Sequence, residues 1–231
     1  DGIRDHCVTG VQTCALPICA AIDWITHNTS HNVALFDSDA DGDLDLLASS
    51  YSANAFRIGR QTNPGQFSNG GDFGTGDFPR KMQTIDLDGD GDLDLILADS
   101  QFNGTGRTRV YQNNAQAGAQ QLDHVADIIG GVEPRESKAA DFNGDGILDL
   151  AVVNFSSGQL WVHLGVGPFD FSGEIQVFEA LSGVLDLKVG DLNGDSRPDI
   201  LVRCADGKIH SFLNQYSDDC DGNGVADDID L

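Results

Sequence analysis

The sequence predicts an all-β fold, specifically a β-propeller built from four-stranded antiparallel blades. Two observations predict it. A nine-residue acidic loop occurs four times, starting at Asp37, Asp86, Asp141 and Asp191, and a repeat of roughly 50 residues indicates stacked supersecondary units. In addition, no segment has a sustained helical period of apolar residues, so we expect almost no helix.

Each repeat has the same order of elements. A short strand enters the acidic loop, an apolar run leaves it, and a Gly/Asn/Ser-rich turn leads to a third and a fourth strand. The second strand is apolar on both faces, which suits a sheet packed between two like sheets, whereas a β-sandwich would expose one face of each strand. We expect first strands at 31–36, 81–85, 137–140 and 186–190, third strands at 55–60, 107–113, 159–165 and 208–214, and fourth strands at 124–129 and 174–180.

The acidic loops place oxygen atoms where a divalent cation needs them. In DLDGDGDLD (86–94), five carboxylates lie within nine residues without a Lys or Arg. Side chains at loop positions 1, 3, 5 and 9 converge when the chain turns sharply at position 6, and position 7 adds a backbone carbonyl. Ca²⁺ takes about six to eight oxygens with tolerant geometry, whereas Mg²⁺ keeps its waters. A metal-free Asp/Gly turn is the alternative, but turn chemistry alone does not require this carboxylate spacing.

We therefore expect Ca²⁺ ligands at positions 1, 3, 5, 7 and 9 of every loop. They are Asp37, Asp39, Asp41, Asp43 and Asp45; Asp86, Asp88, Asp90, Asp92 and Asp94; Asp141, Asn143, Asp145, Ile147 and Asp149; and Asp191, Asn193, Asp195, Arg197 and Asp199. Position 7 contributes only its carbonyl oxygen. Ser196 replaces glycine at position 6 of the fourth loop, at a cost on the order of 1 kcal/mol. We expect this loop to bind most weakly.

The stretches DFNGDGILDLAVVN (141–154) and DLDGDGDLDLILAD (86–99) resemble the FG-GAP/VCBS repeats of integrin α-subunit propellers and of many bacterial exported proteins. The resemblance implies that residues 19–216 form propeller blades, that the calcium loop joins the first two strands of each blade, and that the protein is extracellular or on the cell surface. Because such propellers commonly have seven or eight blades, the roughly four blades present here imply a fragment of a larger propeller. A closed four-bladed ring, completed by residues 20–25, is the alternative.

The two ends of the chain differ from the repeats. Residues 1–18 resemble the in-frame translation of a sequencing-library adapter, in which GACGGCATACGAGAT reads Asp-Gly-Ile-Arg-Asp and only His6 and Cys7 fall on the variable index. We treat them as an artefact and expect a signal peptide upstream. Residues 217–231 form an acidic tail that resembles the calcium loops of dockerin or thrombospondin type 3 repeats, with a polar linker as the alternative. Its expected ligands are Asp219, Asp221, Asn223 and Asp227.

The composition argues against several classes of partner. The formal net charge is −24, from 37 acidic and 13 basic residues, and more than half of the acids lie in the four loops and the tail. No Lys/Arg-rich patch suits a phosphate backbone, so nucleic acid is not expected as a partner. No apolar run has the length needed to span a bilayer. The nine Arg and four Lys are scattered along the sequence.

The sequence contains no catalytic motif of the common hydrolase, zinc-protease, P-loop or dinucleotide-binding types. Because metal binding explains the carboxylate spacing, we expect no catalytic residues. The expected function is a calcium-binding extracellular scaffold for adhesion or recognition of a protein or glycan. The alternative is the propeller portion of an exported carbohydrate-active enzyme, a polysaccharide lyase or hydrolase, which a cluster of Lys, Arg or His at the channel mouth would favour.

Overall fold

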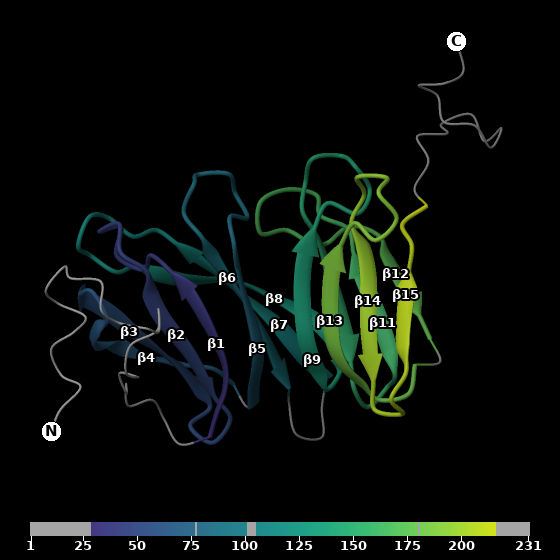
Figure 1. Ribbon diagram of the computed structural model, residues 1–231, viewed down its shortest axis with the longest axis horizontal. Helices are drawn as coiled ribbons and strands as arrows, with labels where there is room; N and C mark the ends of the chain where they lie inside the picture. The colour runs from purple at the N-terminus through teal and green to yellow at the C-terminus, as the bar shows by residue number, and fades with distance from the viewer. Residues whose placement is uncertain (1–28, 77, 101–104, 180, 216–231) are drawn as a thin grey trace, which may run out of the picture.

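The computed structural model describes residues 29–76, 78–100, 105–179 and 181–215. Within these ranges the chain is all-β, with fifteen strands in four antiparallel sheets and no helix. The sheets follow one another along the chain and stand side by side as propeller blades (Figure 1). The predicted fold class is therefore confirmed. The adapter-like segment 1–18 and the tail 217–231 lie outside the described residues.

Strands pair within each blade in the order in which they occur in the chain. Blade 1 contains β1 (Ser30–Phe36), β2 (Asp45–Ser50), β3 (Ala55–Asn63) and β4 (Gln66–Gly74); blade 2 contains β5 (Phe78–Ile85), β6 (Asp94–Ser100), β7 (Thr105–Asn113) and β8 (Leu122–Val132); blade 3 contains β9 (Pro134–Ala140), β10 (Asp149–Asn154), β11 (Gln159–His163) and β12 (Ile175–Phe178); and blade 4 contains β13 (Val184–Gly190), β14 (Asp199–Cys204) and β15 (Ile209–Phe212). Every acidic loop joins the first strand of a blade to the second, as the family resemblance implies.

Strand β4 is the element that the sequence did not predict. Its residues, QFSNGGDFG, are rich in Gly and Asn, which are depleted in strands. Tertiary contacts override this low propensity. Phe73 pairs with Phe56 of β3, and the two rings stack with centroids 4.9 Å apart.

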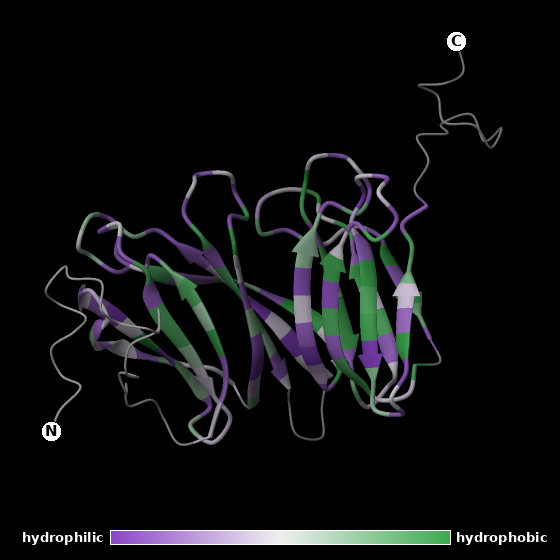
Figure 2. Cartoon of the chain, viewed as in Figure 1, coloured by the Kyte–Doolittle hydropathy of each residue, from purple (hydrophilic) through white to green (hydrophobic). Residues whose placement is uncertain are grey.

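The hydrophobic core lies between blades. Three clusters fill the three interfaces, and residues of the second strands contribute to each of them. Every residue of β6 and β10 is buried, because each of these strands is covered by a blade on either side. Figure 2 shows hydrophobic positions along β2 and β14 as well. The prediction that second strands are apolar on both faces is confirmed.

The first strands of the four blades are the inner strands, since β1 lies against β5, β5 against β9 and β9 against β13. In the described ranges, β13 and β1 do not pack on each other as these neighbours do, so the blades form an open arc. The two end faces of the arc carry exposed apolar residues, Val33 on β1 and Ile209 on β15, each 68% exposed. The described part of the chain has no helix of the length and apolarity needed to cross a membrane.

Candidate metal centres

The four acidic loops follow the same backbone path, which depends on left-handed residues at positions 4 and 6. Their φ angles lie between +54° and +97° in the pairs Ala40 and Gly42, Gly89 and Gly91, Gly144 and Gly146, and Gly194 and Ser196. At each of these glycines an added Cβ would meet no atom within 4 Å, so glycine is favoured for its φ and not for lack of space. Sequence reasoning identified position 6 but missed position 4, where loop 1 has Ala40.

Carboxylates at positions 1, 3 and 5 hold this path by accepting hydrogen bonds from backbone amides further along the loop. In loop 2, the two oxygens of Asp86 accept from Gly89 N at 2.7 Å and Gly91 N at 3.0 Å. Asp88 Oδ1 accepts from Asp90 N at 3.2 Å, and Asp90 Oδ1 accepts from Asp92 N at 2.8 Å. The amides use only part of the acceptor capacity of each carboxylate, and the remaining lone pairs can bind a cation.

The aspartate at position 9 has a structural role that sequence reasoning missed. It is the first residue of each second strand and is at most 1% exposed. In blade 2, Asp94 Oδ2 accepts from Leu87 N of the loop at 2.9 Å, and Oδ1 accepts from Asn113 N at the end of β7 at 2.8 Å. The same two bonds, to the loop and to the third strand or the residues just after it, are made by Asp45, Asp149 and Asp199. Position 9 therefore fixes each loop to the third strand of its own blade.

In the first two loops the carboxylates of positions 1, 3 and 9 converge. One oxygen from each of Asp37, Asp39 and Asp45 lies within 4.8 Å of the others, and the same holds for Asp86, Asp88 and Asp94. Position 5 is not part of either group. These clusters of acidic residues could hold a metal ion.

Loops 3 and 4 have asparagine at position 3 and are less anionic. Asn143 Nδ2 donates to Asp145 Oδ2 at 2.9 Å, and Asn193 makes the same bond to Asp195. Backbone hydrogen bonds, above all from Ser196 and Gly194, lower the pKa of Asp191. The predicted ligands of the tail, Asp219, Asp221, Asn223 and Asp227, lie outside the described residues.

One carboxylate oxygen of Asp39 has no hydrogen-bond partner among the described residues, and a bound cation could be its partner. This residue is 6% exposed, and its Oδ1 is buried without a hydrogen-bond partner among the described residues. The nearest cation, Arg60 Nη1, lies 3.6 Å from the other oxygen. Burial raises the pKa of Asp39, and the charges of Asp41 and Asp45 raise it further. A buried, unpaired carboxylate oxygen is costly, so this loop fits a bound divalent ion.

Burial and neighbouring carboxylates also raise the pKa of Asp94 in loop 2. Burial raises its pKa to about 6, although backbone hydrogen bonds from Asn113 and Leu87 oppose the rise. The charges of Asp88 and Asp90 add to it. Carboxylate and amide oxygens are the donors that hard cations such as Ca²⁺ prefer, so the donor set fits calcium.

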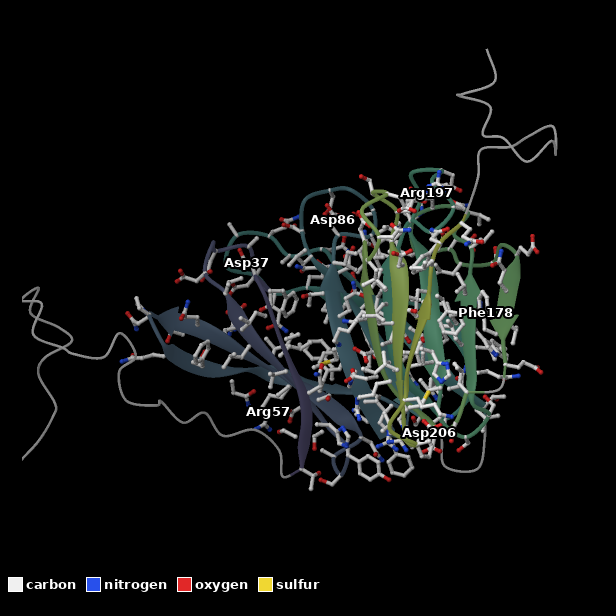
Figure 3. The ribbon with its side chains drawn as sticks, turned by 45° about the vertical axis from the view of Figure 1, so that its right-hand side comes forward. Asp37, Arg57, Asp86, Phe178, Arg197 and Asp206 are labelled. Carbon is white, nitrogen blue, oxygen red and sulfur yellow. The ribbon has the colours of Figure 1, made fainter. Side chains whose placement is uncertain are left out.

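The loops share one end of the blades. Figure 3 shows Asp37, Asp86 and Arg197 at this end, whereas Arg57 and Asp206 lie at the opposite end. The arrangement follows from the topology, because every loop leaves the same end of an inner strand. The acidic surface of the protein is therefore concentrated on one side of the arc.

The basic residues are not scattered in space, contrary to the expectation from the sequence. Lys81, Lys138 and Lys188, three of the four lysines, approach the same carboxylate, Glu136, to within 4.0 Å. They lie on three different inner strands. The repeat period could have revealed this, since Lys81 and Glu136 each stand five residues before their acidic loop, and Lys138 and Lys188 three residues before theirs.

Comparison with known protein families agrees with the repeat structure. The profile of the FG-GAP-like repeat matches residues 37–97 and 141–202, which together make up more than half of the chain. Both matched segments begin at position 1 of an acidic loop and end within the second strand of the next blade. No curated protein sequence matches the chain.

Solved structures are similar to this chain at low sequence identity, and the first of the two below shares its fold. BBS1N, solved in complex with ARL6DN, aligns with a TM-score of 0.57 and 15% identity over 82% of this chain and 55% of its own. The biofilm matrix protein Bap1 of V. cholerae aligns with a TM-score of 0.46 and 18% identity over 80% of this chain and 28% of its own. The chain thus spans about half the length of the first of these structures and less of the second.

Proposed function

The chain belongs to the FG-GAP-like repeat family, and we propose that it is a calcium-binding extracellular β-propeller that serves as a scaffold for adhesion or recognition of a protein or glycan. The coarse part of this proposal, a propeller built from FG-GAP-like repeats, follows from the family match and the fold. Calcium, location and ligand are the parts that experiments must test.

The buried, unpartnered oxygen of Asp39 is the observation that best supports calcium binding. In loop 1 one oxygen of Asp39 lies within 4.8 Å of oxygens of Asp37 and Asp45, and Asp86, Asp88 and Asp94 form the same kind of cluster in loop 2. Calcium sites of extracellular modules have dissociation constants of roughly 10⁻⁴–10⁻³ M, so modest affinity suits a protein outside the cell. An ion that binds only the folded state contributes about 2.7 kcal/mol of stability per site at a concentration 100 times its dissociation constant.

Calcium titration of chelator-treated protein tests this proposal. We expect isothermal calorimetry to show binding that Asp86→Ala weakens, because position 1 has one oxygen in the loop 2 cluster. Asp123→Ala, an acidic residue on β8 outside the loops, serves as the matched control and should leave binding unchanged. Magnesium at the same concentration should bind more weakly. Absence of calcium binding, or equal loss in both variants, would contradict the proposal.

The extracellular location is supported by the loops themselves, because they suit the calcium concentration outside cells. The test is to fuse the coding region, with its native upstream sequence, to a reporter and to follow export. Accumulation of the reporter outside the cell supports the location, and retention in the cytoplasm would contradict it.

A second function, the propeller portion of an exported carbohydrate-active enzyme, is favoured by the convergence of lysines on the inner strands. Ion pairs with Glu136 and Asp186 occupy Lys81 and Lys188. Incubation with acidic polysaccharides, followed by an assay for new reducing ends or unsaturated products, separates the two functions. Turnover that Lys138→Gln abolishes would establish the enzyme, and binding without turnover would support the scaffold.

A further inference from the structure

We propose that basic residues of the inner strands form a binding site for a ligand that carries two or more anionic oxygen groups, carboxylates or sulfates. The inner-strand basic cluster consists of Arg80 and Lys81 on β5, Arg135 and Lys138 on β9, and Lys188 on β13. The inference rests on the proposed recognition function, because it names the chemistry of the ligand that this scaffold would recognise.

Charge is segregated in this protein. The chain has a net charge of −24 and only 13 basic residues, yet five of these 13 belong to the inner-strand basic cluster. Three carboxylates, Glu133, Glu136 and Asp186, form ion pairs with the cluster. The five cations therefore exceed the three anions by two charges. An excess of positive charge attracts anions to this cluster, whereas the acidic remainder of the protein repels them.

Glu136 gathers the ammonium groups from three blades. It is 2% exposed, and its Oε2 accepts from Lys81 Nζ at 2.8 Å and from Leu187 N at 2.7 Å. Its Oε1 accepts from Lys188 Nζ at 3.3 Å. The third ammonium, Lys138 Nζ, is 3.8 Å from Oε1, which is too far for a hydrogen bond. Together with Asp186, which also pairs with Lys81 and Lys188, Glu136 holds three ammonium groups close together and leaves one positive charge in excess.

Two donors of the cluster lack acceptors. Among the described residues, Lys138 makes only the 3.8 Å ion pair, and its side chain is 21% exposed and so can be reached from solvent. Burial lowers the pKa of Lys138, Glu136 opposes this, and the charges of Lys188 and Lys81 lower it further. Arg135 Nε is buried without a hydrogen-bond partner among the described residues. An incoming oxyanion could accept a hydrogen bond from Lys138 Nζ and would relieve the repulsion between the ammonium groups.

The two arginines are held in fixed orientations. Arg80 lies over the ring of Tyr51 at 4.8 Å and Arg135 over the ring of Phe155 at 4.2 Å. Both guanidinium groups bind the same oxygen of Glu133, at 3.4 Å and 2.9 Å. Guanidinium groups that are already ordered lose little side-chain entropy when an anion binds.

The arginines and the lysines of the cluster lie next to each other on the inner strands. Arg80 and Lys81 are consecutive residues of β5, and Arg135 and Lys138 both lie on β9, which packs against β5. Lys81 in turn contacts Glu136 and Asp186. The arginine pair and the lysine group are therefore joined through Lys81. A ligand with two anionic groups could reach both.

The competing explanation is a purely structural network of ion pairs. Isothermal calorimetry with three probes separates the two: trigalacturonate, a trisulfated disaccharide and neutral maltotriose, all in calcium-saturated buffer. We expect at least one of the two anionic probes to bind, more weakly at high salt, and maltotriose not to bind. Which anionic probe binds identifies the group that the site recognises.

The decisive variant is Lys138→Gln, with Lys208→Gln as its matched control. Lys208 is the fourth lysine, is exposed between β14 and β15, and pairs with Asp206 at 3.0 Å. Loss of a charged hydrogen bond should weaken anion binding by roughly tenfold or more, whereas Lys208→Gln should leave it unchanged. Neither variant should lower the melting temperature much. Should Lys138→Gln not fold, Lys188→Gln replaces it, because that side chain is 65% exposed.

Absence of binding by both anionic probes would overturn the inference, as would equal affinity of Lys138→Gln and the unmodified protein. The melting temperature of the same samples with and without calcium keeps the two proposals apart. A calcium effect without anion binding would reject only the anion site. Absence of a calcium effect would reject the calcium-dependent scaffold, whether or not the anions bind.

Discussion

The side-chain amide of Asn113 donates a hydrogen bond to the backbone carbonyl of Asp37, 3.0 Å away, and so ties the end of β7 in blade 2 to the acidic loop of blade 1. The backbone amide of the same residue donates to Asp94 Oδ1 at 2.8 Å. Asn214 makes the equivalent pair of bonds between blades 3 and 4, to Phe142 O and to Asp199 Oδ1, both at 2.7 Å. One asparagine therefore links the acidic loops of blades 1 and 2, and another links those of blades 3 and 4.

This link predicts a stability effect. We expect Asn113→Ala to lower the free energy of unfolding by about 1–3 kcal/mol, because it removes the hydrogen bond to the carbonyl of Asp37 and the one that Asn113 Oδ1 accepts from Ala115 N. Urea denaturation in the presence of EGTA measures the effect without calcium. Asn114→Ala is the control, since the side chain of Asn114 is partly exposed and, within the described residues, bonds to the exposed carboxylate of Asp123 and not to another blade. Equal stability of both variants would contradict the role of Asn113.

Positions 5 and 9 of loop 2 should respond differently to substitution. We expect Asp94→Ala to destabilise the protein by about 2–4 kcal/mol even without calcium, because the amides of Leu87 and Asn113 lose their acceptor. Asp90 is exposed and accepts from Asp92 N, so Asp90→Ala should destabilise the calcium-free protein less than Asp94→Ala does. If Asp90 binds calcium, as its position in the loop predicts, the substitution should also reduce the stabilisation that calcium adds. Urea denaturation of each variant with calcium and with EGTA measures both effects. If Asp94→Ala left the calcium-free protein unchanged, position 9 would be a ligand without a structural role.

Left-handed residues with a side chain should be points of strain. Ala40 has φ +54° and Ser196 has φ +67°, where the other loops have glycine. We expect Ala40→Gly and Ser196→Gly each to stabilise the calcium-free protein by about 0.5–1 kcal/mol. Ala117→Gly, at an exposed turn residue outside the left-handed set, should not stabilise it. Thermal unfolding measures the three variants. Ser196→Gly should also tighten calcium binding, and a titration without tightening would refute the expectation that loop 4 binds most weakly.

Asp186 predicts part of the acid sensitivity. Although burial has the opposite effect, hydrogen bonds involving Lys81 and Glu136 lower the pKa of Asp186 below its ordinary value. A lowered pKa means that this group stabilises the folded protein above its unfolded-state pKa of about 3.9 and that the contribution disappears as the pH falls further. We expect Asp186→Asn to lose less stability than the unmodified protein between about pH 4 and pH 2. Urea denaturation at these pH values measures the free energy of unfolding. An equal loss in Asp186→Asn and the unmodified protein would contradict this prediction.

The fold could be predicted from the sequence because the residues that define each repeat lie close together in the chain. The carboxylates and glycines of an acidic loop lie within nine residues, and the apolar run after each loop predicts a strand buried on both faces. Strand β4 was missed because its stability comes from the stacking of Phe73 on Phe56 and not from its own Gly-rich sequence. Local composition predicts such an edge strand poorly.

The site could be predicted only in part, for the same reason. The spacing of the acidic residues identified the candidate metal ligands. The structural role of Asp94, however, depends on its hydrogen bond with Asn113, which belongs to another strand of the blade. The convergence of Lys81 and Lys188 on Glu136 depends on three blades at once. Contacts of this kind follow from the way in which repeats stack, and they become visible in the sequence only when equivalent positions of the repeats are compared.

The most direct test of the calcium scaffold is thermal unfolding of one preparation in millimolar calcium and in EGTA, at the same ionic strength. If two loops hold calcium with dissociation constants of roughly 10⁻⁴–10⁻³ M, the ion should add about 1–3 kcal/mol of stability at about 1 mM, and more if further loops bind, and should raise the melting temperature by several degrees. Superimposable unfolding curves in calcium and in EGTA would contradict the account.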